Sequence, residues 1–455
     1  MPPALIIQDE LHLIEGPLGS MVGLFETVVE ALSTWRGSPG ATMELPKYVA
    51  STATIRQAAV QVRALFDRDV IQFPPQGLTA DDSFFAVTSE PHPLDEVTAG
   101  RLYLGIAAPG KGAQTPIVRI WSSLLHNSFE AYTARPSDDT DRFWTLAAYF
   151  NAVRELAGAA TLYRQDIPER LLYRFPPNPR GAGGLDDYME LSSRVDSMEL
   201  PSRLGLLARP AGLAVVCATS MFGTGVDIDR LGLMVVHGQP KTTATYIQAT
   251  GRVGRRGGAL VVSFLRASRP RDLDHYEYFV GYHRSLYRHV EAITVSPFAP
   301  KARERALGPI AVSLLRQASE IDGQQVHQDW RVEQRLANRQ VYSEAARMAT
   351  HRRDAEVLAI PAILERRARS QPLSVRPLAT ATGIEANAEL DAWQRAARLA
   401  SNRNDFVYNE PAMFQAPTRA VVLGDPQHAA NGLDQCFENA PQSLREVEET
   451  TTFET

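Results

Sequence analysis

The hydrophobic residues at the start of the chain form one short continuous run. Residues 4–7 are all apolar and lead directly into Gln8, Asp9 and Glu10. A continuous apolar run of this length is typical of a parallel strand that is buried on both faces. Such a strand needs neighbouring strands, which should lie upstream in the chain. We therefore expect the sequence to derive from a truncated or split reading frame.

After this strand, residues 8–75 are predicted to alternate between helices and strands. A loop containing Gly16, Pro17 and Gly19 is expected first, and the apolar spacing then predicts a helix over about 21–35. A short strand at 47–50 and a helix at about 56–68 follow. Proline disfavours helix in residues 73–75, so this segment is expected to cross, extended, to a second lobe.

A second block of alternating pattern begins near Arg101. Apolar runs predict strands at 102–106, 144–150, 213–218, 233–237 and 259–265, with helices such as 116–128 and 246–253 between them. This alternation predicts a parallel sheet covered by helices on both faces. Residues 176–184 are rich in Pro and Gly and predict a surface loop. Helical periodicity without clear strands runs from about 274 to 370, and the end from about 402 is irregular and acidic.

Composition and charge narrow the class of protein. Of the 455 residues, 44% are hydrophobic and 22% are charged, which is ordinary for a globular chain, and the formal net charge is -5. The chain lacks the overall basic charge that would indicate nucleic-acid binding, although a motor can bind nucleic-acid strands through local loops. Only Cys217 and Cys436 occur, so a disulfide framework or zinc cluster is not expected and a reducing cytoplasm fits. Neither a signal peptide nor an apolar run long enough for a membrane span is present, so no membrane partner is expected.

The most chemically suggestive residues follow the first strand. Asp9 and Glu10 stand at its carboxyl end, where ligands bind in open α/β sheets, and His12 follows them. In a nucleotide hydrolase the first carboxylate helps to hold Mg²⁺ and the second polarises the attacking water. Acidic pairs are common, so a polar loop that happens to follow a strand is the alternative.

Two further segments carry small polar residues directly after predicted strands. Ser51 and Thr52 follow residues 47–50, where hydroxyl groups can relay between a nucleotide and a bound strand, although a turn or helix cap explains them as well. The loop 219–227 follows residues 213–218; its glycines let backbone approach a ligand closely, and its aspartate can accept from a ribose hydroxyl or an arginine. A simple turn is the alternative. The residues singled out in this loop are Thr219, Gly223, Gly225 and Asp227.

The fourth segment runs from Gln248 to Arg255 with the pattern Gln-x-x-Gly-Arg-x-Gly-Arg. Within the predicted helix, Arg252 and Arg255 are three residues apart and share a face. Two guanidinium groups aimed together suit a phosphate chain. Gly251 and Gly254 cost about 1 kcal/mol each relative to alanine in a helix, which indicates close packing. A solvated basic helix end is the alternative.

The order of these segments resembles motifs II, III, V and VI of superfamily 2 DNA/RNA helicases, in which ATP and Mg²⁺ lie between two RecA-like lobes. The resemblance implies that Asp9 is the metal ligand, that Glu10 is the base and that Arg252 and Arg255 act on the phosphates, with Arg255 the arginine finger. The nucleotide is expected near Gly223, Gly225, Asp227 and Gln248. The residues expected to couple the nucleotide to nucleic acid are His12, Ser51, Thr52 and Thr219. Residues 144–150 with Asn151 occupy the place of motif IV.

The resemblance also implies the fold class and the domains. We expect an α/β chain with an incomplete first RecA-like lobe at 1–75 and a complete second RecA-like lobe of the P-loop NTPase fold at 76–270. A mainly helical appendage at 271–400 and an irregular tail at 401–455 follow. Residues 9–20, 73–78, 82–86, 246–255 and 440–448 are, in addition, similar to the helicase subunits of the DISARM anti-phage system. That narrower resemblance implies phage DNA and a second DISARM subunit as partners.

Two other segments leave alternatives open. The helicase phosphate loop, Gly-x-x-x-x-Gly-Lys-Ser/Thr, is expected upstream of Asp9 and is missing, so the isolated chain is expected to be inactive as an ATPase. A near match at 105–112 comes after the carboxylates, at the start of the second lobe, and has Gly112 where the Mg²⁺-binding hydroxyl belongs. A nucleic-acid phosphate contact through Lys111 and a plain surface loop are the competing interpretations. Residues 276–289 mix aromatic and basic side chains; packing against the second lobe is favoured over stacking on single-stranded bases. Overall, a motor is favoured over a non-catalytic binding subunit or half of a split motor.

Overall fold

The structure is a computed structural model, and it describes most of the chain between residues 3 and 401. The described residues are 3–34, 44–52, 55–73, 75, 82–83, 86–87, 100–175, 180, 187–192, 194–196, 198–219, 228–292, 295–317, 320–321, 324–325, 355–372, 376–401, 406–407 and 420–421.

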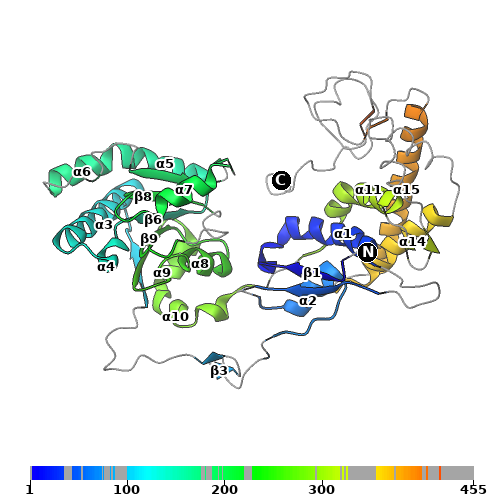
Figure 1. Cartoon of the computed structure of the whole chain (residues 1–455), viewed down its shortest axis with the longest axis horizontal. Helices are drawn as coiled ribbons and strands as arrows, with labels where there is room; N and C mark the ends of the chain where they lie inside the picture. Colours follow the sequence, from blue (N-terminus) through cyan, green and yellow to red (C-terminus); the bar gives the residue numbers. More distant parts are fainter. Residues whose placement is uncertain are drawn as a thin grey trace. The chain divides into compact units, whose positions relative to one another are not determined.

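The chain divides into two compact units (Figure 1). Unit 1 combines residues 1–75 with residues 292–455, and unit 2 consists of residues 76–291. The four-part domain division expected from the sequence stays a prediction.

Unit 2 is built on a six-stranded parallel sheet, as the alternating pattern predicts. The strand order is β5-β10-β9-β6-β8-β7. One strand, β7, was not predicted, because it has only four residues and alternates between half-buried and buried positions instead of forming an apolar run. The strands are β5 Arg101–Ala107, β6 Leu146–Phe150, β7 Tyr188–Leu191, β8 Val215–Ala218, β9 Leu233–His237 and β10 Ala259–Leu265.

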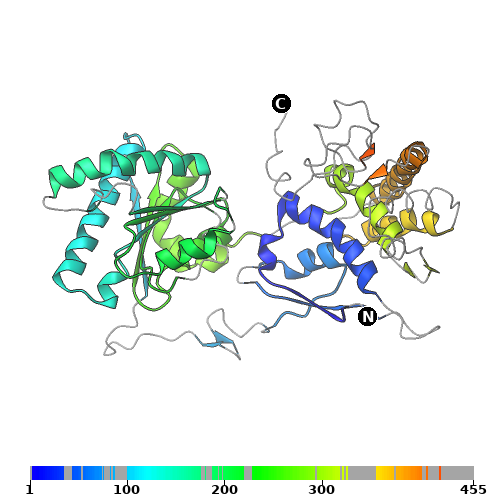
Figure 2. The same cartoon turned by 45° about the horizontal axis from the view of Figure 1, so that its top comes forward.

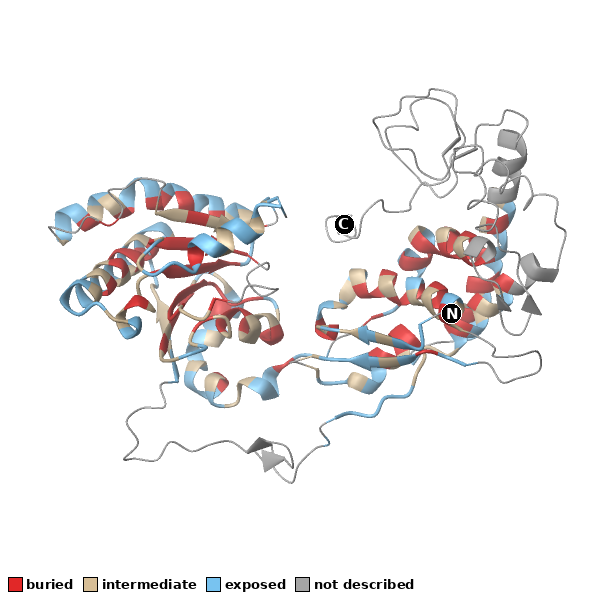
Figure 3. Cartoon of the chain, in the orientation of Figure 1, coloured by how far each residue is buried: buried red, intermediate tan, exposed pale blue. Residues whose placement is uncertain are grey.

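Helices cover both faces of this sheet (Figure 2). Within β6, Leu146, Ala148 and Phe150 pack toward one face, whereas Ala147 and Tyr149 pack toward the other, so every residue of the strand is buried (Figure 3). One face is covered by α3 Gln114–Ala134, α5 Val153–Arg164 and α6 Asp166–Arg174, and the other by α7 Leu200–Leu207, α8 Thr243–Thr250 and α10 Phe279–Arg284. The remaining elements are α4 Asp138–Asp141, α9 Pro270–Glu277 and η3 Leu286–His289.

The predicted surface loop at 176–184 lies mostly outside the described residues, but Arg180 within it is buried, which the prediction did not anticipate. Its guanidinium lies over the Trp144 ring at 4.3 Å and donates to the Ser128 hydroxyl at 2.7 Å and to the Trp144 carbonyl at 2.5 Å. Burial lowers the pKa of Arg180 to about 10, which leaves it charged at neutral pH. The aromatic face and the hydrogen bonds compensate for burying this cation.

Unit 1 begins with two short parallel strands, β1 Leu5–Gln8 and β2 Lys47–Ala50. The expectation that β1 is buried on both faces is wrong here, since the side chains of Leu5 and Ile7 are 48% and 69% exposed. Among the described residues β1 pairs with β2 alone, so only the face that carries Ile6 and Tyr48 is even half-buried. The other helices and short strands of this N-terminal part are η1 Leu11–Leu13, α1 Gly16–Ser33 and α2 Ala58–Phe66, with β3 Asp82–Ser83 and β4 Ala86–Val87 following in unit 2.

The predicted loop around Gly16 is instead the first turn of α1. Pro17 fits there because the first helical positions need no amide hydrogen, and its ring angle suits the helix. Gly19 packs so closely against Val295 and the Ile14 backbone that a Cβ at this position would collide with both. These glycines therefore serve helix entry and close packing.

Residues far apart in sequence share the core of unit 1. Met21, Leu24 and Val28 of α1 pack with residues of α11, α14 and α15, including Leu307, Ile360 and Leu390. The C-terminal helices therefore share a hydrophobic core with the N-terminal helix α1. Their bounds, with those of the short strands, are α11 Pro300–Gln317, β11 Glu320–Ile321, β12 Gln324–Gln325, α14 Ala355–Arg369, α15 Arg376–Ser401, β13 Phe406–Val407 and β14 Ala420–Val421. Among the described residues, no helix is long and apolar enough to cross a membrane.

Candidate functional site

The acidic pair lies where β1 ends, beside the end of β2. Pairing continues past both strands, because the Ser51 amide donates to the Gln8 carbonyl at 2.9 Å and the Leu11 amide donates to the Ser51 carbonyl at 3.0 Å. This register brings Ser51 to Asp9, and the Ser51 hydroxyl donates to Asp9 Oδ1. The Glu10 amide donates to the same oxygen at 2.9 Å. Two segments 42 residues apart in sequence thus meet at one carboxylate.

The surroundings of Asp9 favour its charged form. The hydrogen bond from Ser51, followed by that from the Glu10 amide, holds the pKa of Asp9 below its ordinary value of 3.8. Glu10 has a left-handed backbone, with a φ of 52°, which is uncommon for a residue with a side chain. The turn therefore departs sharply from the strand direction at the residue predicted to act on water.

A magnesium ion fits Asp9 only as part of a shared coordination. Asp9 is exposed and is held in the ionised form that Mg²⁺ requires. Among the described residues, no group of three or more His, Cys, Asp or Glu side chains gathers to enclose a metal. Mg²⁺ commonly takes one or two carboxylates and completes its octahedron with phosphate oxygens and water. The donor set present here is of that open kind.

His12 connects the acidic pair to the other hydroxyl residue. It is buried, and its Nδ1 lies 3.0 Å from Thr52 Oγ1 and 3.3 Å from Glu10 Oε2. The turn that carries His12 is held by Gln61 of α2, whose Nε2 donates to the Leu11 carbonyl at 3.2 Å and to the Ile14 carbonyl at 2.9 Å. Gln61 was missed at the sequence level. The one sign of its role in the sequence is that a polar residue stands next to the apolar positions of α2.

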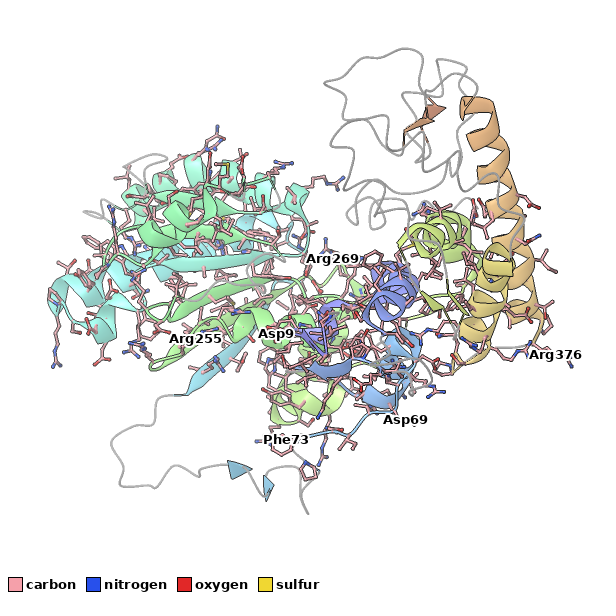
Figure 4. The ribbon with its side chains drawn as sticks, turned by 45° about the vertical axis from the view of Figure 1, so that its right-hand side comes forward. Asp9, Asp69, Phe73, Arg255, Arg269 and Arg376 are labelled. Carbon is pink, nitrogen blue, oxygen red and sulfur yellow. The ribbon has the colours of Figure 1, made fainter. Side chains whose placement is uncertain are left out.

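The arginine segment differs from the prediction in its local structure. Helix α8 ends at Thr250, so Arg252 and Arg255 lie beyond it and do not share a helical face. Gly254 has a φ of +72°, which ends any helical path between the two arginines. Arg252 is half-buried, and Arg255 is exposed (Figure 4). The expected close packing of the glycines is confirmed, since a Cβ on Gly254 would lie 2.7 Å from that of Ala259.

Backbone contacts fix the course of this segment. The Gly254 amide donates to the Leu231 carbonyl at 2.7 Å. Arg101, at the start of β5, donates from Nε to the Val253 carbonyl at 2.7 Å and from Nη2 to the Gly251 carbonyl at 3.3 Å. Arg101 was also missed by the sequence reasoning, because its partners are about 150 residues away. The arginine segment is therefore held in place by a third, structural arginine.

Helix α8 itself is fastened to the sheet by a tyrosine. The Tyr246 hydroxyl lies 2.9 Å from Ser263 Oγ of β10 and 2.9 Å from His283 Nε2. Gln248 follows on this helix; it is half-buried, and its Nε2 lacks a hydrogen-bond partner among the described residues. A buried amide without a partner is costly, which is consistent with a group reserved for a ligand.

The predicted loop 219–227 is described only at its start. Thr219 is buried at the carboxyl end of β8, where its amide donates to the Leu191 carbonyl at 3.3 Å. Gly223, Gly225 and Asp227 lie outside the described residues.

Asn151 follows β6 and joins it to the neighbouring strand. Its Nδ2 donates to the carbonyls of His237, Gly238 and Gln239 at 3.2, 3.2 and 3.4 Å. Asn151 therefore closes the carboxyl edge of the sheet by binding backbone. Burial lowers the pKa of His237 to about 3, so this histidine is neutral in the core.

The near match to a phosphate loop is structurally different from one. Gly105 lies inside β5, where a Cβ would approach the Phe279 ring at 2.8 Å. Because Gly105 has no side chain, the Phe279 ring can pack directly against it. Lys111 and Gly112 lie in an exposed connection between β5 and α3. This geometry favours a plain surface loop, and a phosphate contact through Lys111 stays a prediction.

The structure thus assembles the predicted residues in two places. Asp9, Glu10, His12, Ser51 and Thr52 come together in unit 1. Thr219, Gln248, Arg252 and Arg255 belong to unit 2. Figure 4 labels Asp9 and Arg255 as the representatives of the two sets.

The fold and these segments define a class of protein. Residues 194–257, which include β8, β9, α8 and the arginine segment, match the family described as helicase conserved C-terminal domain. Together with the parallel sheet of unit 2, this match confirms the predicted α/β fold with a RecA-like second lobe. The chain is a helicase-like protein of superfamily 2.

At the level of a single protein, the chain is similar to the DISARM protein DrmA of Bacillus paralicheniformis. The two are 45% identical over 325 residues, which cover 69% of this chain and 28% of DrmA. The chain thus spans less than a third of the length of that relative. The narrower resemblance to the helicase subunits of the DISARM system is confirmed.

Solved helicase structures show weaker similarity. The DUF1998 helicase MrfA bound to DNA has a TM-score of 0.48 and 17% identity, covering 77% of this chain and 42% of MrfA. The Mycobacterium smegmatis helicase Lhr bound to single-stranded DNA and AMP-PNP has a TM-score of 0.44 and 16% identity, covering 68% of this chain and 34% of Lhr.

Proposed function

We propose that this chain is part of an ATP-dependent DNA translocase that acts in anti-phage defence in the cytoplasm. ATP and Mg²⁺ are its cofactors, phage DNA is its substrate, and a second DISARM subunit is its partner. The identity to DrmA supports the defence role and the partner.

The observation that carries this proposal is the contact between Ser51 and Asp9. A hydroxyl from the second strand donates to the carboxylate at the end of the first and lowers the pKa of Asp9. A docking platform has no need of an exposed carboxylate that is held in position beside a second carboxylate and a buried histidine. A motor needs this connection, because changes at the nucleotide must reach the segment that holds nucleic acid.

We assign the roles as follows. Asp9 holds Mg²⁺, which neutralises phosphate charge when bound, and Glu10 orients the attacking water. His12, Ser51, Thr52 and Thr219 transmit the state of the nucleotide. The phosphate and nucleotide contacts come from Gln248, Arg252 and Arg255, with Gly223, Gly225 and Asp227 beside them.

The test compares ATP hydrolysis, with and without single-stranded DNA, in residues 1–455 and in a form extended upstream to include a phosphate loop. We expect negligible hydrolysis by residues 1–455 and DNA-stimulated hydrolysis by the extended form. In the extended form, Glu10→Gln and Arg255→Ala should each abolish turnover and leave strand binding largely intact.

Matched controls are available on unit 1. Asp69 and Arg376 are exposed and labelled in Figure 4, and neither belongs to the segments above. Asp69→Asn and Arg376→Ala should leave turnover unchanged. Turnover that survives both Glu10→Gln and Arg255→Ala contradicts the assigned roles, and strand binding without any hydrolysis by the extended form supports a non-catalytic binding subunit instead.

A further inference from the structure

The aromatic and basic residues that follow the sheet of unit 2 divide into two groups. One group faces inward, as the sequence analysis favoured. Phe279 packs on Gly105, and Tyr282 is buried, where it accepts from Gln239 Nε2 and donates to Thr243 Oγ1, each at 3.1 Å. His283 Nδ1 lies 2.8 Å from the Phe279 carbonyl, and its Nε2 is reached by the Tyr246 hydroxyl. These contacts anchor α10 firmly on the sheet.

The second group faces solvent on the same short stretch. The side chains of Tyr278 and Tyr287 are 68% and 71% exposed. Arg284, Arg288 and His289 are exposed as well. Exposed aromatic side chains alone are ordinary, but here two tyrosines stand beside exposed basic side chains, so both are available to contact a ligand.

The charge of this stretch is one-sided. Residues 278–290 contain two arginines and two histidines and not one carboxylate, in a chain whose formal net charge is -5. The flanking carboxylates are Glu277, which is exposed, and Glu291, which accepts from the Thr243 amide at 2.9 and 2.8 Å. Between these two carboxylates the charged side chains are all basic, which is complementary to a polyanion.

We propose that residues 278–289 form a binding site for single-stranded nucleic acid, separate from the motif residues. Bases stack on Tyr278 and Tyr287, and Arg284 and Arg288 pair with phosphates. Aromatic side chains next to cationic ones bind single strands of any sequence, because every base has a flat face that can stack on an aromatic ring. This site deepens the proposed function, on which it rests, by naming a contact that keeps the strand on unit 2.

The test measures binding of residues 1–455 to a fluorescently labelled oligothymidylate by anisotropy, without ATP. Leucine at Tyr278 and Tyr287 keeps apolar bulk and removes the flat ring, so the variant Tyr278→Leu/Tyr287→Leu should bind about tenfold more weakly for each tyrosine. Tyr278→Phe/Tyr287→Phe should bind like the wild type. Tyr173→Leu, at an 88% exposed position of α6, is the matched control and should change nothing.

The arginines are tested by salt dependence. Arg284→Gln/Arg288→Gln should reduce the slope of log affinity against log salt by about 1.4, since each phosphate contact on a single strand contributes roughly 0.7. Full binding by the leucine variant, or no strand binding by the wild type, overturns the site; the former would point to a protein partner. Because no hydrolysis is measured, loss of binding in the leucine variant supports the site even if the extended form proves inactive as an ATPase.

Discussion

Replacing Arg367 with alanine should destabilise unit 1 strongly. Arg367 lies on α14 with a side chain only 6% exposed. Its Nη2 donates to the Leu65 carbonyl at 3.0 Å, and its Nη1 lies 3.1 Å from Asp67 Oδ2 and 3.4 Å from Glu30 Oε2. One guanidinium thus joins a C-terminal helix to both N-terminal helices. Burial lowers the pKa of Arg367, and the nearby carboxylates oppose that shift.

The magnitude follows from what remains after the substitution. Removing one partner of a buried ion pair costs about 3–5 kcal/mol, because the other charges stay without compensation. Glu30 still has Arg68 at 3.3 Å and Asp67 still has Arg63 at 3.2 Å, which places the loss at the lower end. At about 2–4 °C per kcal/mol for a domain of roughly 150–250 residues, a loss of about 3 kcal/mol lowers the Tm by about 6–12 °C.

Differential scanning calorimetry of residues 1–455 measures this effect, and the melting of unit 2 serves as an internal reference. The matched variant is Arg369→Ala on the same helix, where a 59% exposed arginine pairs with Glu365 at 2.7 Å. Such an exposed pair contributes at most about 0.5 kcal/mol. If Arg367→Ala and Arg369→Ala shift the melting of unit 1 equally, the buried network is not what joins the two ends of the chain.

Three other changes test local features. Ser51→Ala should raise the pKa of Asp9 toward its ordinary value, as measured by NMR titration of the carboxyl group. An unchanged pKa would show that the hydrogen bond from Ser51 does not cause the low pKa of Asp9. Burial raises the pKa of Glu26, so this residue stabilises the fold less as the pH rises above its ordinary value of 4.5. Glu26→Gln should therefore increase the free energy of unfolding at pH 7 but not below pH 4.5 in urea titrations, and a pH-independent effect would contradict this reasoning. Gly254→Ala should cost more than roughly 1–2 kcal/mol, because the left-handed backbone alone costs about that much and a Cβ would also lie 2.7 Å from that of Ala259. In the open loop, a Cβ on Gly112 would meet no atom within 4 Å, so Gly112→Ala should be nearly neutral; equal losses for both glycines would refute the assignment of strain.

Much of the sheet was predictable because buried parallel strands are continuous apolar runs. The predicted strands at 233–237 and 259–265 agree with the structure in both bounds. The short strand at 47–50 also agrees, although it lies in unit 1 and is largely exposed. The edge strand β7 was not predictable in this way, since Glu190 interrupts its apolar residues. Helix α8 lies three residues earlier than predicted: it begins after the capping Thr242, whose side chain accepts from the Thr245 amide, and ends before Gly251.

The residues of the site could be predicted from the sequence, but the residues that hold them in place could not. The pattern identified Asp9 and Ser51 separately, and only the register of β1 on β2 shows that their side chains meet. Gln61 and Arg101 act on backbone carbonyls far away in sequence, and no local pattern marks such contacts. The exposed and the buried aromatic residues of 278–289 are of the same residue types. Only the fold therefore shows which of them face solvent.

The shared core of unit 1 has a consequence during protein synthesis. Helix α1 buries its apolar face against α11, α14 and α15, whereas unit 2 is contiguous in sequence. At about 5–20 residues per second, roughly 15–60 s pass between translation of the first helices and that of α14. Unit 2 therefore has time to fold on the ribosome first. Meanwhile, the apolar face of α1 stays uncovered until α11, α14 and α15 have been translated, so this helix is exposed to contacts with a chaperone.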